Sequence, residues 1–306
     1  MKILVVGAGA IGGYFGGRLL AAGREVTFLV RPGRRRRLAE NGLVIRSGFG
    51  DLTLPDPPAV TAGELRGPFD LVLVSCKAYD LEGAIADFAP AVGPDTAILP
   101  VVNGMRHLEQ FDQAFGPGHA LGGLCLISSA LDPEGRILHR NNLHGLVYGE
   151  RDGSRSVRTE AITATLSGAG FEPRLSGEIL LEMWEKWVFI ATLAGINCLM
   201  RAPVGDIVAA GAGDLAVALM EECAAIAAGE GFPPRAETLD RVRAMVTTPG
   251  SPLTASMLGD LERGAAIEAG HVIGDLLRRG VTPGAYPVLT VVHAHLKTYE
   301  ARRARD

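Results

Sequence analysis

A glycine-rich turn near the start of the chain constrains the fold more than any other feature. It reads Gly7-Ala8-Gly9-Ala10-Ile11-Gly12. The apolar run Lys2–Val6 precedes it and a helical pattern over 10–22 follows, the strand–turn–helix context that gives a GxGxxG spacing meaning. Gly7 permits a tight turn, Gly9 lets the backbone approach a pyrophosphate, and Gly12 lets the helix pack on the strand. We predict that all six residues bind a dinucleotide; a glycine-rich turn without a ligand is the alternative.

The end of the second predicted strand, Glu25–Val30, indicates which dinucleotide is bound. Chains that bind NAD carry an acidic residue there for the ribose 2′-hydroxyl. This chain has Arg31 instead, followed by four more arginines at 34–37. A guanidinium suits the 2′-phosphate of NADP, because it can donate two charge-assisted hydrogen bonds. We therefore predict NADP(H) as the cofactor with Arg31 on its phosphate, and we interpret most of Arg34–Arg37 as a solvated helix face.

The rest of the first half alternates apolar runs with helical patterns, which predicts an α/β fold with a parallel sheet. The runs Asp70–Ser75 and Ala97–Val102 are continuously apolar, as strands buried on both faces are, and Leu81–Ala89 between them has helical character. Further strands are expected at 120–127, 136–140 and 144–149, and we expect them to extend the same sheet in an antiparallel sense.

The second half shows helical patterns and no convincing strand after residue 178. We place a domain boundary near 176–177, between a dinucleotide-binding domain of residues 1–176 and an all-helical domain of residues 177–306. Prolines and glycines, such as Pro203 and Pro283-Gly284, mark the predicted breaks between helices. The expected helices cover residues 178–200, 205–229, 235–246, 253–279 and 286–304.

Composition excludes several classes of function. The 306 residues include 30 basic and 34 acidic side chains, a net charge of −4 that provides no general basic field for nucleic acid. The apolar stretch Val188–Met200 is too short to span a bilayer, and no signal peptide precedes the strand at Lys2, so we expect a cytoplasmic protein. The cysteines are far apart, which predicts reduced thiols and no metal site. They are Cys76, Cys125, Cys198 and Cys223.

Three polar residues could perform chemistry beside a nicotinamide cofactor. Lys186 lies on a helical stripe of apolar residues, so it is either desolvated in a site, where it would donate a proton readily, or one half of a surface pair with Glu182. Lys77 and Asn103 follow two predicted parallel strands, and ligands bind at that edge of such sheets. An exposed loop lysine and an ordinary Asn-Gly turn are the alternatives for these two.

Over nearly its full length the chain resembles the ketopantoate reductase (2-dehydropantoate 2-reductase) family. The matching pieces are the glycine turn, Arg31, Cys76-Lys77-Ala78, Asn103-Gly104-Met105, Trp184-Glu185-Lys186, Ser256-Met257-Leu258 with Glu268 twelve residues on, and Tyr286-Pro287-Val288-Leu289. The resemblance implies a Rossmann-type N-terminal domain, an all-α C-terminal domain and a site in the cleft between them. It also implies NADPH-dependent reduction of 2-dehydropantoate to pantoate, in pantothenate biosynthesis.

The same resemblance implies roles for single residues. Lys186 would be the general acid and would touch the substrate, a small 2-oxo acid. Asn103 would bind both cofactor and substrate, Lys77 and Glu268 the cofactor, and Ser256 the substrate. If 253–279 forms one helix, Ser256 and Glu268 lie about 18 Å apart, which agrees with their separate roles.

The chain departs from the family pattern where asparagines are expected to bind pantoate. Ile190, Ala194 and Val204 stand at those positions, and Asn197, about 16 Å along the helix from Lys186, cannot replace them. A site that loses matched hydrogen-bond partners changes what it accepts. Two alternatives therefore stay open, a reductase of a more apolar 2-oxo acid and a non-catalytic NADP-binding regulatory protein. The helical half could form a homodimer, although no heptad seam is evident.

Overall fold

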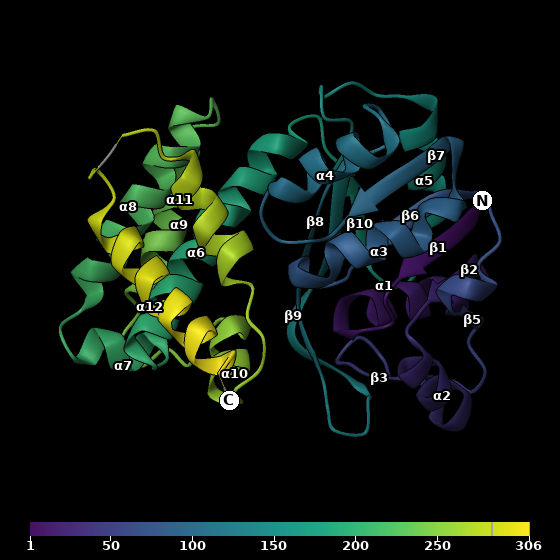
Figure 1. Cartoon of the computed structure of the whole chain (residues 1–306), viewed down its shortest axis with the longest axis horizontal. Coiled ribbons are helices and arrows are strands. Elements are labelled where there is room, and N and C mark those ends of the chain that lie inside the picture. Colours follow the sequence, from purple (N-terminus) through teal and green to yellow (C-terminus); the bar gives the residue numbers. More distant parts are fainter. Residues whose placement is uncertain (283, 306) are drawn as a thin grey trace. The chain divides into compact units, whose positions relative to one another are not determined.

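The computed structural model describes residues 1–282 and 284–305, which form two compact units. The first comprises Met1–Val102 and His107–Ile179, and the second comprises Asn103–Arg106 with the chain from Leu180 onward. All strands of the described chain lie in the first unit, whereas the second is helical (Figure 1). The sequence predicts neither the assignment of Asn103–Arg106 to the second unit nor the division after Ile179. Pro283, one of the predicted helix breaks, lies outside the described residues.

The first unit contains the predicted parallel sheet, whose strands run in the order β5-β2-β1-β6-β7. Its strands are β1 (Lys2–Val6), β2 (Glu25–Leu29), β5 (Ala59–Val60), β6 (Phe69–Val74) and β7 (Val92–Pro100). All four neighbouring pairs are parallel, and Ile3, Leu4 and Val5 in the central strand are fully buried. Such a sheet places the carboxyl ends of β2, β1 and β6 side by side on one edge.

A second sheet replaces the predicted antiparallel extension of the first, so that prediction is wrong. Strands β8 and β9 do pair antiparallel, but β9 also pairs with β3 and β10, and β3 pairs with β4. An isolated parallel bridge between Ile98 and Ala120 joins the start of this region to β7. The strands are β3 (Leu43–Arg46), β4 (Leu52–Leu54), β8 (Gly122–Leu131), β9 (Ile137–Gly149) and β10 (Glu172–Leu175).

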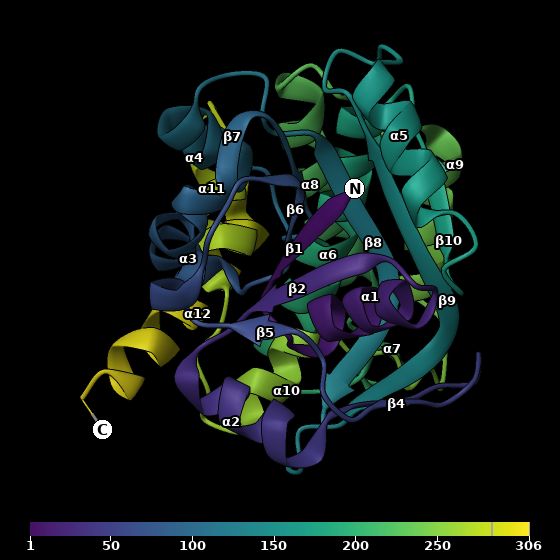
Figure 2. The same cartoon turned by 90° about the vertical axis from the view of Figure 1, so that its right-hand side faces the viewer.

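Helix α1 (Ala10–Ala21) explains why two sheets form, because it is buried on both sides. A Cβ on Gly16 would lie 2.6 Å from the Phe28 ring of the first sheet, and one on Gly13 would lie 2.5 Å from Ile137 of the second. Glycines therefore bring both sheets close to the helix, which Figure 2 shows between β2 and β9. The unit's other helices are α2 (Pro32–Asn41), α3 (Leu81–Phe88), α4 (Arg106–Phe115, whose first residue belongs to the second unit) and α5 (Val157–Leu166).

The second unit is built from helices around a core that includes Trp187, Ala194 and Leu276. They are α6 (Ile179–Met200), α7 (Val204–Ala209), α8 (Gly213–Gly229), α9 (Ala236–Val246), α10 (Ser256–Glu262), a π-helix (Gly270–Gly274), α11 (Asp275–Arg279) and α12 (Pro287–Arg303). Among the residues described, none of the helices combines the length and hydropathy that a bilayer-crossing segment needs.

Two of the predicted helices are interrupted. The segment predicted at 205–229 divides into α7 and α8 at Gly211, whose φ of +78° is a left-handed conformation that favours glycine. The single helix predicted over 253–279 is also wrong, because Gly264 has a φ of +69° and residues 265–268 are irregular. The helical reading that placed Ser256 and Glu268 about 18 Å apart therefore does not apply.

Candidate functional site

The glycine turn joins β1 to α1, and its three glycines have different reasons to be glycine. Gly7 has a φ of +93°, which side chains disfavour, and it donates a hydrogen bond to the Leu29 carbonyl at 2.9 Å. A Cβ on Gly12 would lie 2.1 Å from both the Gly7 carbonyl and Ser75 Oγ. A Cβ on Gly9 would meet nothing within 4 Å. Backbone conformation thus accounts for Gly7 and close packing for Gly12, while Gly9 borders open space.

The first turn of α1 offers backbone N–H groups at that open space. Its N-cap is Gly9, which provides no side-chain cap, and the first turn contains no acidic residue. Uncapped N–H groups and the helix dipole together favour a bound anion. Ala8, Ala10 and Ile11 complete the turn, so all six residues predicted to bind the dinucleotide lie together here.

Arg31 lies at the carboxyl end of β2 and forms the N-cap of α2. Its side chain is 74% exposed and makes a 2.6 Å ion pair with Asp80, which follows β6. The hydrogen bond and the charge of Asp80 raise the pKa of Arg31. Lys77 is half-buried at the start of the short 3₁₀ turn Ala78–Asp80. Arg31 and Lys77 thus follow the two strands that flank β1.

Arg34 departs from the solvated helix face predicted for most of its run. Its Nε donates to the Ala8 carbonyl at 2.9 Å, and its Nη1 donates to the Gly135 carbonyl at 3.0 Å. Burial, with a smaller contribution from Arg37, lowers the pKa of Arg34. Arg34 therefore links the glycine turn to the loop before β9. The sequence cannot assign this role to Arg34, because four arginines are adjacent there.

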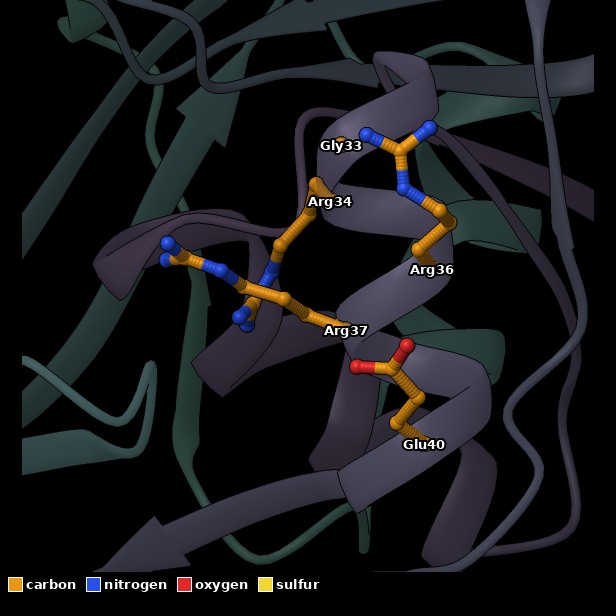
Figure 3. Close-up of a pocket in the computed structure, with 5 residues that line it drawn as sticks. All are labelled: Gly33, Arg34, Arg36, Arg37 and Glu40. Carbon is orange, nitrogen blue, oxygen red and sulfur yellow. The ribbon is translucent and has the colours of Figure 1, made fainter.

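An arginine-rich hollow of about 370 Å³ lies beside this link. Figure 3 shows Arg34 and Arg37 directed to one side of α2 and Arg36 away from them. The lining residues are Gly33, Arg34, Arg36, Arg37 and Glu40. Because Arg36 and Arg37 are exposed, this hollow is an open, cationic part of the surface next to Arg31 in sequence.

In the second unit, the π-helix gathers two of the predicted site residues. Gly104 has a φ of +81°, and a Cβ there would lie 3.0 Å from Cδ2 of His271. His271 also forms a hydrogen bond with the backbone of Asn103. Burial lowers the pKa of His271, although the negative charge of Glu268 acts to raise it. The Glu268 carbonyl accepts hydrogen bonds from the N–H groups of His271 and Val272 at 3.2 and 2.9 Å. Asn103 and Glu268 thus both interact directly with His271.

Helix α6 carries Lys186, half-buried, and packs on the same π-helix. Trp187, fully buried, donates from Nε1 to the Val272 carbonyl at 2.8 Å. On the other side of Lys186, Glu185 accepts a hydrogen bond from the Arg235 backbone N–H at 2.9 Å and two from its guanidinium. Burial alone would raise the pKa of Glu185, but these hydrogen bonds outweigh it and the pKa is lowered. Both neighbours of Lys186 are therefore fixed in place.

The remaining substrate predictions also fall in the second unit. Ser256 is the first residue of α10 and is exposed. Ala194 and Val204 are buried and Ile190 is half-buried, so all three positions present apolar groups within the helical unit. Asn197 is fully buried: its amide donates to the Ala202 carbonyl at 2.8 Å and accepts from the Ala255 N–H at 2.9 Å. Its polar atoms serve the fold.

Comparison with known proteins identifies the family. Residues 3–153 match the family model described as "Ketopantoate reductase PanE/ApbA", and residues 178–300 match its C-terminal counterpart. The chain belongs to the ketopantoate reductase family. It is 41% identical over 305 residues to the "Uncharacterized oxidoreductase YkpB" of Bacillus subtilis, covering 99% of this chain and 100% of that protein.

Other relatives of this chain carry more specific names. It is 29% identical over 303 residues to a 2-dehydropantoate 2-reductase of Mesorhizobium japonicum, covering 92% of this chain and 91% of that protein. A crystal structure of 2-dehydropantoate 2-reductase from Methylococcus capsulatus superposes with a TM-score of 0.87 at 29% identity, covering 100% and 99% of the two chains. The α/β and all-helical architecture predicted from the sequence is thereby confirmed, as is membership of an oxidoreductase family.

Metal-binding groups do not gather in the part of this chain that the structure describes. No group of three or more His, Cys, Asp or Glu side chains in residues 1–282 and 284–305 could hold a metal ion. The four cysteines form no disulfide, and burial raises the pKa of Cys198 and of Cys223 to about 12. These two thiols are therefore protonated packing groups at neutral pH.

Proposed function

We propose that this ketopantoate reductase family member is an NADPH-dependent 2-oxo-acid reductase. The observation that carries the proposal is the glycine turn, where a Cβ on Gly9 would enter open space beside the uncapped start of α1. A pyrophosphate fits such a position because the backbone can approach it closely and the helix dipole favours its charge. No packing within the protein requires glycine at this position.

NADPH is favoured over NADH by the residue at the end of β2. Arg31 lies where an NAD-binding chain has a carboxylate, and its guanidinium, although paired with Asp80, is largely exposed, so a 2′-phosphate would have access to it. Lys77, after β6, would add a second positive charge to the nucleotide site. The cofactor supplies a hydride to the C2 carbon of the substrate.

The proton for the reduced carbonyl would come from Lys186. Reduction of a ketone develops negative charge on its oxygen, so a positioned acid must deliver a proton there. Lys186 is half-buried on α6 between Glu185 and Trp187, both fixed by hydrogen bonds, which holds this part of the helix in one place. Asn103 and Ser256 would bind the 2-oxo acid, and Asn103 and Glu268 would bind the cofactor.

A Gly9→Ala variant tests the nucleotide site. The added methyl group has room in the protein, so the variant should fold normally and yet lose NADPH affinity by at least tenfold. Gly48→Ala is the matched control, because its methyl group also meets nothing within 4 Å but lies away from the turn. Thermal melting and NADPH titration of both variants are the measurements. Unchanged NADPH affinity in a folded Gly9→Ala protein would contradict the proposal.

A second candidate is the same reaction on a 2-oxo acid more apolar than ketopantoate. It is favoured by the apolar side chains at positions 190, 194 and 204, since lost hydrogen-bond partners change which substrate a site accepts. The test compares kcat/KM for ketopantoate with values for 2-oxo acids that carry aliphatic or aromatic side chains. A higher kcat/KM for the apolar acids supports this candidate, and a clear preference for ketopantoate rejects it.

A further inference from the structure

The ion pair between Arg31 and Asp80 connects two strands that are not neighbours. Arg31 follows β2 and Asp80 follows β6, and β1 lies between those strands in the sheet. Adjacent strands are about 4.8 Å apart, so the pair extends over roughly 10 Å of the sheet's carboxyl edge. Its two partners therefore follow the strands on either side of β1, which itself leads into the glycine turn.

The two partners differ in how firmly they are held. Asp80 has a side chain that is 29% exposed and ends a short 3₁₀ turn that leads directly into α3, whereas the Arg31 side chain is 74% exposed. The more exposed guanidinium thus pairs with a carboxylate that is the more buried of the two partners. A ligand group that binds Arg31 at this edge comes within a few ångströms of the Asp80 carboxylate as well.

We infer that Asp80 is a specificity-determining residue that reduces the preference of this enzyme for a 2′-phosphorylated nucleotide. The carboxylate competes with a 2′-phosphate for Arg31, and it repels the phosphate directly. A ribose 2′-hydroxyl carries no charge and can donate a hydrogen bond to the same carboxylate. The inference rests on the proposed nucleotide site, and it adds that the site accepts NADH to a greater extent than Arg31 alone would allow.

Coulomb's law sets the size of the effect. A carboxylate and a phosphate dianion about 6 Å apart in a water-like dielectric repel each other enough to change a dissociation constant by about tenfold. An exposed ion pair contributes little to folding stability, so removing Asp80 should leave the fold intact. The Asp80 side chain also makes no hydrogen bond that caps α3.

The experiment is a titration of wild-type protein and Asp80→Asn with NADPH and with NADH, without a 2-oxo acid. We expect the ratio of the NADH Kd to the NADPH Kd to rise about tenfold in Asp80→Asn. Asp87→Asn is the matched control, because it removes the same charge from α3 near Arg31 without removing the ion pair. That ratio should change by less than about twofold in the control.

Two other results would overturn the inference. A folded Asp80→Asn protein whose ratio is unchanged or lower shows that Asp80 does not oppose the 2′-phosphate, and the proposed nucleotide site is then unaffected. Wild-type protein that binds neither nucleotide removes the proposed function and this inference together. Asp80→Ser provides a second variant without the charge, and it must raise the ratio in the same way.

Discussion

The two units of this ketopantoate reductase family member present their predicted ligand contacts in different ways. In the first, the groups proposed to face a nucleotide at the glycine turn are backbone groups: an uncapped helix start and a glycine whose missing side chain leaves room. In the second, the contacts are side chains that come from separate elements, with Asn103 and Glu268 held beside His271 and Lys186 placed on α6. We therefore expect that the contacts of the glycine turn and proton donation by Lys186 can be altered separately, because they lie in different units, with Asn103 and Glu268 adding proposed cofactor contacts from the second unit.

Lys186→Ala should have the largest effect and tests this separation directly. Loss of a general acid lowers kcat by about 10²–10⁴-fold, while the NADPH Kd should change little. The measurements are steady-state kinetics and NADPH titration. Lys297→Ala is the control, since Lys297 pairs with Glu300 on α12 and has no proposed role. An equal weakening of NADPH binding in Lys186→Ala would break the comparison.

Arg31→Ala should affect the first unit, by weakening NADPH binding. Losing charge-assisted hydrogen bonds to a 2′-phosphate should raise the NADPH Kd by about 30-fold and leave the NADH Kd nearly unchanged. Arg36→Ala, an exposed arginine on the same helix, is the control. The dissociation constants of both nucleotides are measured. If Arg31→Ala weakened NADH binding as much as NADPH binding, Arg31 would not contact the 2′-phosphate.

Glu185→Gln concerns the support of Lys186. Hydrogen bonds from Arg235 outweigh the effect of burial and lower the pKa of Glu185 in the folded protein. The carboxylate therefore contributes its full stabilisation to the fold above the pKa of about 4.3 that it has in the unfolded chain. This stabilisation is lost as the pH falls through the lower pKa of the folded protein. We expect the free energy of unfolding of the variant to be about 1–2 kcal/mol lower than that of the wild type at pH 7. Urea denaturation between pH 7 and pH 3.5 should show this difference shrinking; a constant difference would count against the ion pair.

Ile190→Asn should have the smallest effect, and it sharpens the comparison within the second unit. Returning one hydrogen-bonding side chain a turn after Lys186 should raise kcat/KM for ketopantoate by about three- to tenfold, the value of one hydrogen bond. The NADPH Kd should not move. Val291→Asn, at an exposed apolar position on α12, is the control. No gain for ketopantoate would mean that position 190 does not contact the substrate.

The sequence predicts the first unit well where function depends on local geometry. The turn from Gly7 to Gly12 is one continuous segment, and its strand and helix are where periodicity places them. The second sheet was not predicted as a separate layer, because that requires knowing that α1 is buried on both faces. The link from Arg34 to the Ala8 carbonyl joins residues 26 positions apart, and one of four adjacent arginines makes it.

The helical unit was harder to predict because its contacts depend on tertiary packing. A helix pattern over 253–279 does not reveal the irregular residues 265–268 or the π-helix that follows them, where the Glu268 carbonyl accepts from the His271 and Val272 N–H groups. His271 itself carries no sequence signal, since a histidine in an apolar helix is most often a packing residue. The roles of Lys186, Asn103 and Ser256 remain predictions from the family resemblance, supported by their positions in the second unit.

The most direct measurement is the consumption of NADPH and of NADH by the purified protein in the presence of ketopantoate and of more apolar 2-oxo acids. We expect that one of these acids is reduced with a kcat/KM of about 10⁴ M⁻¹s⁻¹ or more, and that NADPH is used in preference to NADH. NADPH binding without turnover of any 2-oxo acid would contradict it, because the nucleotide site would then be present without the chemistry assigned to Lys186.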